Sequence, residues 1–177
     1  MKLWQWIGFG VVTLAGTILH FLYSWTGGSI WAAPFSGVNE SVWEHMKLLF
    51  WPLFFFALVQ RVCFRRQENY WRVKLRGTLL GLLLIPVLFY TCNGAFGKSP
   101  DWLNIAIFYI SAGAVFLFEY RAFKILRPGS RLSFAVLCLV GALFVVFTFA
   151  PPHIPLFQDP NNDFSFVRTS LPAKAVV

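Results

Sequence analysis

Long apolar segments separated by short polar segments make up most of this chain of 177 residues. Each apolar segment supplies roughly the 17–25 residues that an α-helix needs to cross a bilayer. The five segments are residues 3–23, 42–63, 77–93, 102–120 and 132–150. The first follows a single lysine and lacks a small-residue cleavage site, so we interpret it as a retained helix. The pattern predicts an all-α, polytopic membrane protein, a bundle of five transmembrane helices.

The composition agrees with a membrane domain and excludes an ordinary soluble one. Hydrophobic residues make up 58% of the chain and charged residues 12%, whereas soluble domains carry about 25% charged residues. The short connections leave no room for a second domain, so residues 1–160 are expected to form a single five-helix transmembrane domain. Residues 161–177 begin as a polar segment and are expected to form a flexible tail.

Basic residues concentrate on one side of the predicted membrane. The N-terminal segment and alternate connections hold eleven basic and two acidic residues, whereas the other side holds four basic and five acidic residues. Because short cytoplasmic loops carry the excess of Lys and Arg, the N-terminus is predicted inside, and the C-terminus and its tail outside. Basic loops of this kind set topology and attract acidic lipid headgroups. They therefore do not indicate a nucleic-acid partner.

The start of the second predicted helix carries the densest group of polar residues, Glu40, Ser41, Glu44, His45 and Lys47. Ser41 followed three residues later by Glu44 matches a capping box, in which the serine caps the helix and the glutamate reaches back to it. Capping does not account for the other three residues. Charged side chains that face lipid are costly, so this group is expected to face the bundle interior and to form pairs.

All three histidines lie on the same, extracytoplasmic side. His20 ends the first helix and His45 begins the second, at similar depth on helices joined by a short loop. That loop, residues 24–39, holds tryptophans that suit an interfacial anchor, and it could also cover a polar pocket. His153 follows the last helix in a proline-rich arm that is expected to be stiff and to fold back over the bundle. We expect the histidines to converge with a glutamate of the second helix start in one polar pocket.

Three imidazoles with nearby carboxylates suit a catalytic zinc ion that keeps a position open for water. In this hypothesis the metal ligands are His20, His45 and His153. Glu40 or Glu44 acts as general base, and Asp159 orients a histidine. Lys47 contacts an anionic headgroup or a developing oxyanion. The residues expected to bind substrate at the polar rim are Asn39, Ser41, Tyr90 and Asn93.

The zinc ion is a hypothesis, because neither an HExxH nor an HxxxH pair occurs in the sequence. Without a metal, Ser41 and His45 could act as nucleophile and base one turn apart. The capping role of Ser41 competes with that use.

Three sequence motifs resemble those of a known family. They are HFLY at 20–23, VNESVWEHMKLLFWP at 38–52 and FTFAPPHIPLFQDP at 147–160. Together they resemble DUF6512, a family of small bacterial integral-membrane proteins of unknown function, over nearly the whole chain. Family members continue with an ending rich in glycine and tyrosine, where this chain has NNDFSF. The resemblance implies a multi-pass protein of the bacterial cytoplasmic membrane, and it implies no reaction.

The polar residues favour a membrane-embedded hydrolase or an acyl or lipid transferase at the extracytoplasmic face. Its substrate would be a membrane lipid, a lipid-linked precursor or a lipoprotein. One alternative is a small transporter or lipid translocator, although such proteins usually bind substrate at the midplane in broken helices of repeated halves. Another is a non-catalytic partner subunit of a second membrane protein. The sequence leaves the oligomeric state open.

The charge distribution gives a direct test of topology. Reporter domains fused after Gln67 and Gly129 should be cytoplasmic, and those fused after Lys98 or at the C-terminus should be extracytoplasmic, because basic loops stay inside. Fusions to alkaline phosphatase and to green fluorescent protein report the two sides. An active phosphatase fused after Gln67 would contradict both the orientation and the extracytoplasmic position of the histidines.

Overall fold

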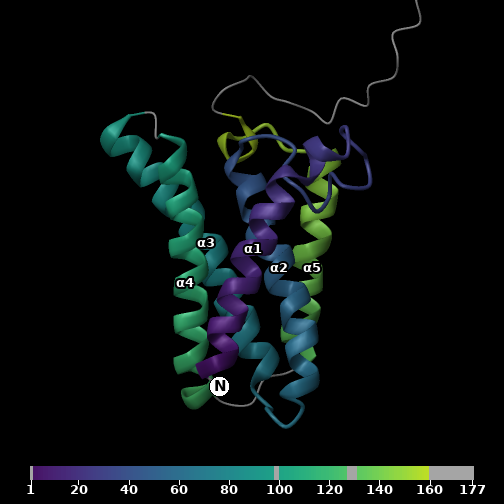
Figure 1. Ribbon diagram of the computed structural model, residues 1–177, viewed down its shortest axis with the longest axis vertical. Coiled ribbons are helices and arrows are strands. Elements are labelled where there is room, and N and C mark those ends of the chain that lie inside the picture. The colour runs from purple at the N-terminus through teal and green to yellow at the C-terminus, as the bar shows by residue number, and fades with distance from the viewer. Residues whose placement is uncertain (1, 98–99, 127–130, 160–177) are drawn as a thin grey trace, which may run out of the picture.

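The computed structural model describes residues 2–97, 100–126 and 131–159, and the regular secondary structure in these ranges is helical (Figure 1). The elements are α1 (Lys2–Trp25), α2 (Val42–Cys63), α3 (Tyr70–Phe96), α4 (Asp101–Ile125), α5 (Arg131–Phe149) and the 3-10 helix η1 (Pro155–Phe157). Five helices are long and apolar enough to cross a membrane. The predicted fold class is therefore confirmed. The expected tail, residues 161–177, lies outside the described residues.

The start of α3 and the end of α4 extend well beyond the predicted segments. α3 begins at Tyr70, seven residues before the predicted start, and α4 continues five residues past its predicted end, to Ile125. The reason is a buried ion pair, in which Lys74 Nζ lies 2.6 Å from Glu119 Oε2. Lys74 was expected in the connection before the third helix and Glu119 at the end of the fourth, and in the structure the two charges neutralise each other between the helices. Lys74 therefore belongs to the bundle and not to the connecting loop.

α2 is the central helix of the bundle. It contacts α1, α3, α4, α5 and η1. One apolar cluster surrounds its fully buried Leu49, and a second surrounds its fully buried Phe50. Glycine brings α1 close to this core, because a Cβ atom at Gly16 would overlap the ring of Phe108 in α4.

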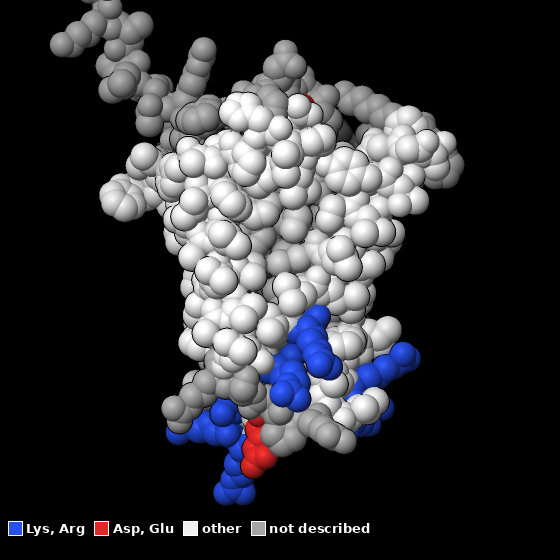
Figure 2. Space-filling view, turned by 180° about the vertical axis from the view of Figure 1, so that it is seen from behind, with Lys and Arg blue, Asp and Glu red and all other residues white. Residues whose placement is uncertain are grey.

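The two ends of the bundle differ in charge. Lys and Arg side chains gather at the end that holds the N-terminus (Figure 2), which we call the basic end. His20 and His45 lie at the opposite end, the histidine end, where α1 ends and α2 begins. There α3 and α4 lean away from the other helices (Figure 1). Pro86 lies within α3, and an internal proline removes a helix hydrogen bond and bends the helix.

The segments that follow α1 and α5 both fold back onto the histidine end. The Ser36 hydroxyl donates to the Leu19 carbonyl and accepts the Tyr23 N–H group, which joins the first segment to α1. After α5, η1 places Phe157 against Trp43 of α2, with ring centroids 4.6 Å apart. The proline-rich arm therefore folds back as expected, and an aromatic contact anchors it.

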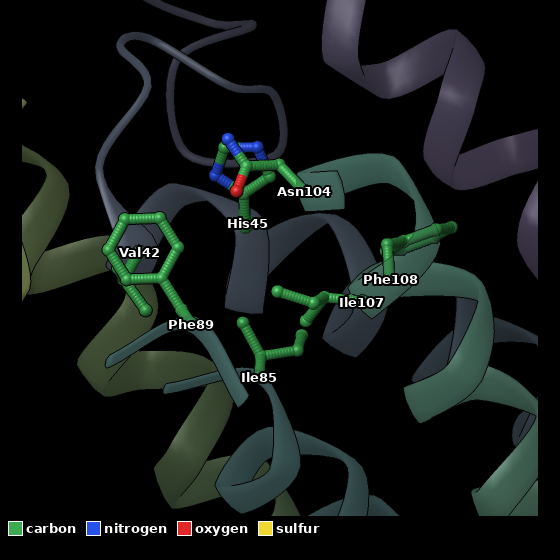
Figure 3. A pocket seen from close by; sticks show the side chains of 7 residues that line it. All are labelled: Val42, His45, Ile85, Phe89, Asn104, Ile107 and Phe108. Carbon is green, nitrogen blue, oxygen red and sulfur yellow. The ribbon is translucent and has the colours of Figure 1, made fainter. Parts of the chain in front are cut away.

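A small pocket marks the place where α2, α3 and α4 meet at the histidine end (Figure 3). The residues that line it are Val42, His45, Ile85, Phe89, Asn104, Ile107 and Phe108. Ile85 and Ile107 belong to the buried core, whereas His45 and Asn104 are half-buried and polar. The apolar packing of the bundle therefore gives way to polar side chains at the level of these two residues.

Candidate functional site

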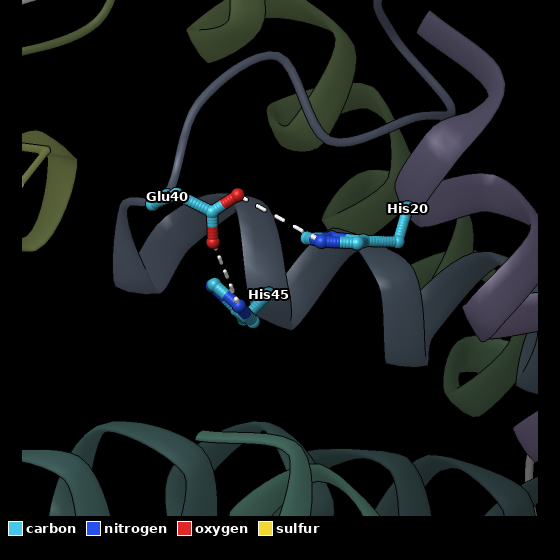
Figure 4. A group of neighbouring side chains, drawn as sticks. All are labelled: His20, Glu40 and His45. Carbon is cyan, nitrogen blue, oxygen red and sulfur yellow. Dashed lines mark ion pairs between the residues drawn. The ribbon is translucent and has the colours of Figure 1, made fainter. Parts of the chain in front are cut away.

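Three polar side chains meet at the histidine end (Figure 4). His20 lies in the last turns of α1, Glu40 lies just before α2, and His45 lies in the first turn of α2. The Glu40 carboxylate lies between the two rings, with Oε1 3.7 Å from His20 Nε2 and Oε2 3.7 Å from His45 Nε2. One ligand atom of each residue lies within 4.8 Å of the others. We call these residues the His–Glu–His group. The sequence predicted that all three histidines would meet with Glu40 or Glu44, and the structure brings two of them together with Glu40.

The backbone around Glu40 is held by neighbours from both folded-back segments. The Gly37 N–H group donates to the Leu19 carbonyl at 3.4 Å, which brings the loop to the end of α1. Asp159, in the arm after α5, accepts the Glu40 backbone N–H group through Oδ2 at 3.4 Å. Asp159 was expected to orient a histidine; in the structure its carboxylate contacts the backbone of Glu40.

The tautomer of His45 follows from one hydrogen bond. Its Nδ1 atom lies 2.9 Å from the Ser41 carbonyl oxygen. A carbonyl oxygen only accepts, so Nδ1 carries the proton and Nε2 of the neutral ring presents a lone pair. That lone pair faces the Glu40 carboxylate across 3.7 Å. Two electron-rich atoms in this position are stabilised by a cation, either a proton on the ring or a metal ion.

Ser41 is the N-cap of α2, as the sequence predicted. Its Oγ atom accepts the Glu44 N–H group at 3.4 Å, and its own N–H group donates to Asn39 Oδ1 at 2.9 Å. The Glu44 carboxylate does not complete the capping box there and instead accepts the Val38 N–H group at 2.8 Å. Ser41 is 1% exposed, and a hydroxyl with this capping contact is poorly placed to act as a nucleophile.

Glu44 and Lys47 form a buried ion pair beside the site. Lys47 Nζ lies 2.7 Å from Glu44 Oε2, and the lysine side chain is 0% exposed. The same ammonium group donates to the Ala33 carbonyl at 2.8 Å and to Thr148 Oγ1 at 3.0 Å. The expected roles of Glu44 as general base and Lys47 as headgroup contact do not fit this burial. The pair joins α2, the preceding loop and α5.

Three further residues that were expected at the site lie elsewhere in the described part of the chain. His153 is exposed in the arm and is not a member of the His–Glu–His group. Phe157, in the same arm, packs against Trp43 of α2. Tyr90 is 43% exposed on α3, and Asn93 Nδ2 donates to the Phe89 carbonyl at 2.9 Å. Neither of these two residues is among those that line the cavity described next.

A cavity of about 420 Å³ opens beside the His–Glu–His group. Thr17 and Phe21 line it from α1, and Asn104 and Tyr109 line it from α4. Asn104 Oδ1 is buried and has no hydrogen-bond partner among the described residues. The sequence reasoning missed Asn104, although an amide near the start of an apolar helix is itself a polar signal.

Comparisons with known proteins identify a family and no activity. The model of the family of unknown function DUF6512 matches residues 1–163. Neither the curated proteins nor the solved structures contain a match to the chain.

Replacing Lys47 with Met should destabilise the fold, because Glu44 would keep a charge in an apolar surrounding without its partner. Removing one partner of a buried ion pair typically costs about 3–5 kcal/mol. We expect a low yield and a lower midpoint of thermal unfolding in detergent. The matched control is Glu40→Gln, which alters a side chain that is 48% exposed and should unfold near the wild-type midpoint. A Lys47→Met protein as stable as wild type would contradict the structural role.

Proposed function

Because the chain belongs to DUF6512, a family of unknown function, we propose its activity from the geometry of the site. The proposed activity is that of a membrane-embedded, metal-dependent hydrolase or acyl or lipid transferase. Its substrate is a membrane lipid, a lipid-linked precursor or a lipoprotein at the extracytoplasmic face of the bacterial cytoplasmic membrane. The observation that carries the proposal is the convergence of two imidazoles and one carboxylate beside a cavity.

The donor set of the His–Glu–His group fits zinc. Catalytic zinc sites use three protein ligands, two histidines and a glutamate among the known sets, and leave a fourth position for water or substrate. Tetrahedral ligands at about 2.0–2.1 Å from zinc lie about 3.4 Å apart. In the group each imidazole nitrogen lies 3.7 Å from a different oxygen of Glu40, and one ligand atom of each residue lies within 4.8 Å of the others. The hydrogen bond from His45 Nδ1 to the Ser41 carbonyl is the outer contact that metal-bound imidazoles usually make.

A bound metal ion supplies Lewis acidity, which polarises a carbonyl or phosphoryl oxygen and activates water. The residues of the chain divide the remaining tasks. His20 and His45 provide ligands from two packed helices, and Glu40 provides the third from the loop. Asn104 belongs to the cavity wall formed by α4. Its amide N–H groups are offered to the substrate oxygen that gains negative charge during the reaction.

Charge and aromatic side chains support a substrate of the outer leaflet. Lys and Arg gather at the basic end (Figure 2), which lies opposite the ends of α1 and α2 that hold His20 and His45. The excess of Lys and Arg favours the cytoplasmic side for the basic end. Trp25 is the last residue of α1, and Trp31 lies in the loop that follows, so both are at the histidine end. Both are exposed, as is typical of tryptophans at headgroup depth. His20 precedes Trp25 in α1 and so lies slightly deeper. That depth is where lipid headgroups join their chains.

Metal analysis tests the proposal. Purified protein should carry about one zinc ion per chain, with zinc–nitrogen distances of about 2.0–2.1 Å by X-ray absorption. His20→Ala, His45→Ala and Glu40→Gln should each lower the zinc content about tenfold, because each removes a ligand. His153→Ala is the matched control and should keep the metal, because His153 is not in the group.

Two results would count against this proposal. Zinc that stayed bound in all three ligand variants would show that the metal sits elsewhere. Turnover of a fluorescent phospholipid that survived chelation and was lost in His45→Ala would favour acid–base chemistry by the same side chains. Metal content is measured by mass spectrometry and turnover in detergent micelles, so the two results are independent.

A further inference from the structure

The cavity beside the His–Glu–His group lies on the seam between α1 and α4 and opens sideways. Its walls include Thr17 and Phe21 of α1 and Ile105 and Tyr109 of α4. Ile105 is 60% exposed, and Tyr109 is 41% exposed. In a helix bundle that crosses a membrane, side chains exposed at this depth face lipid chains. The opening therefore leads from the polar group into hydrocarbon.

A second hollow of about 510 Å³ follows the same seam toward the basic end. Phe9 and Gly113 are among its lining residues. The Phe9 ring separates the two hollows, because it packs against Tyr109 and Phe116 with centroid distances of 6.5 Å and 6.4 Å. The seam is thus divided into two compartments, and of these two only the one near His20 is lined by members of the His–Glu–His group.

The compartment near His20 has the depth of one leaflet. Phe9 lies eleven residues before His20 in α1, which corresponds to about 16 Å along the helix axis. The hydrocarbon core of a bilayer is about 30 Å thick. The Phe9 ring therefore closes the compartment near the middle of the membrane.

We infer that this compartment of the α1–α4 seam holds one acyl chain of the substrate while the polar head lies at the His–Glu–His group. The inference rests on the proposed function and names its substrate class, a lipid with an acyl chain no longer than one leaflet. The lateral opening admits the chain from the bilayer without passage through water. The bound chain holds the polar bond nearest to it, at the junction of chain and headgroup, beside the His–Glu–His group and Asn104. A much longer polyprenyl chain exceeds the depth of the compartment and would have to leave it through the lateral opening.

Photolabelling tests the inference. The probe is phosphatidylglycerol with a diazirine at the middle of one acyl chain, reconstituted with the purified protein in nanodiscs. We expect labels at Ile105 and Tyr109 about fivefold above those on lipid-facing side chains outside the seam, because a pocket holds its ligand longer than open lipid contact does. Thr17→Trp, which fills the seam, should lower these labels about fivefold. Ile18→Trp is the matched control, since Ile18 is exposed beside Thr17 and does not line the cavity.

Zinc content is measured on the same samples and separates this inference from the proposed function. Labels in the seam together with an absence of zinc would overturn the metal-dependent function and support the chain site. Zinc together with labels spread evenly around the bundle would overturn the chain site and leave the metal site standing. A photoreactive polyprenyl phosphate that labelled the seam as strongly as the phospholipid would overturn the assignment of a one-leaflet acyl chain. The wild-type map decides the matter even if Thr17→Trp fails to fold.

Discussion

A charge inside an apolar helix bundle is stable when an opposite charge lies against it. Two pairs among the described residues meet that condition, Lys74 with Glu119 at 2.6 Å and Lys47 with Glu44 at 2.7 Å. Each pair is buried and neutralises itself, so neither offers a charge to a ligand. Glu40 is different, because its carboxylate is half-exposed and its neighbours are two imidazoles that are charged only when protonated. The site therefore lies where charge compensation is incomplete.

The buried pair nearest the site also explains why so many polar residues crowd the start of α2. Lys47 reaches the Ala33 carbonyl and Thr148, and the Glu44 carboxylate reaches the Val38 N–H group. These contacts hold the loop before α2 against α2 and α5, and Glu40 belongs to that loop. One part of the polar segment therefore builds the support, and another part faces the cavity. A helix cap alone would need neither the buried ion pair nor the carboxylate that faces the cavity.

The long apolar segments were enough to predict five membrane-spanning helices. A segment in lipid must form its own backbone hydrogen bonds, and it must be long enough to cross the bilayer. The apolar pattern misplaced the start of α3, because Lys74 is compatible with a helix interior only through a partner on α4. The meeting of His20 and His45 was predictable, since a short loop joins their helices. Asn104 is visible in the sequence as a polar residue in an apolar helix, but its place beside the histidines depends on how α4 packs against helices that are distant in sequence. The arm that carries His153 packs on α2 through Phe157. The polar motif gives no sign of this aromatic contact, so the place of His153 could not be predicted from it.

The Phe9 ring, packed against Tyr109 and Phe116, interrupts the seam between α1 and α4 near the middle of the membrane. On the proposal above, this ring lies between a lipid held near His20 and the hollow near the basic end. Such a lipid would keep its polar head in the leaflet from which it entered. Chemistry at the His–Glu–His group would then alter the composition of one leaflet and leave the other unchanged.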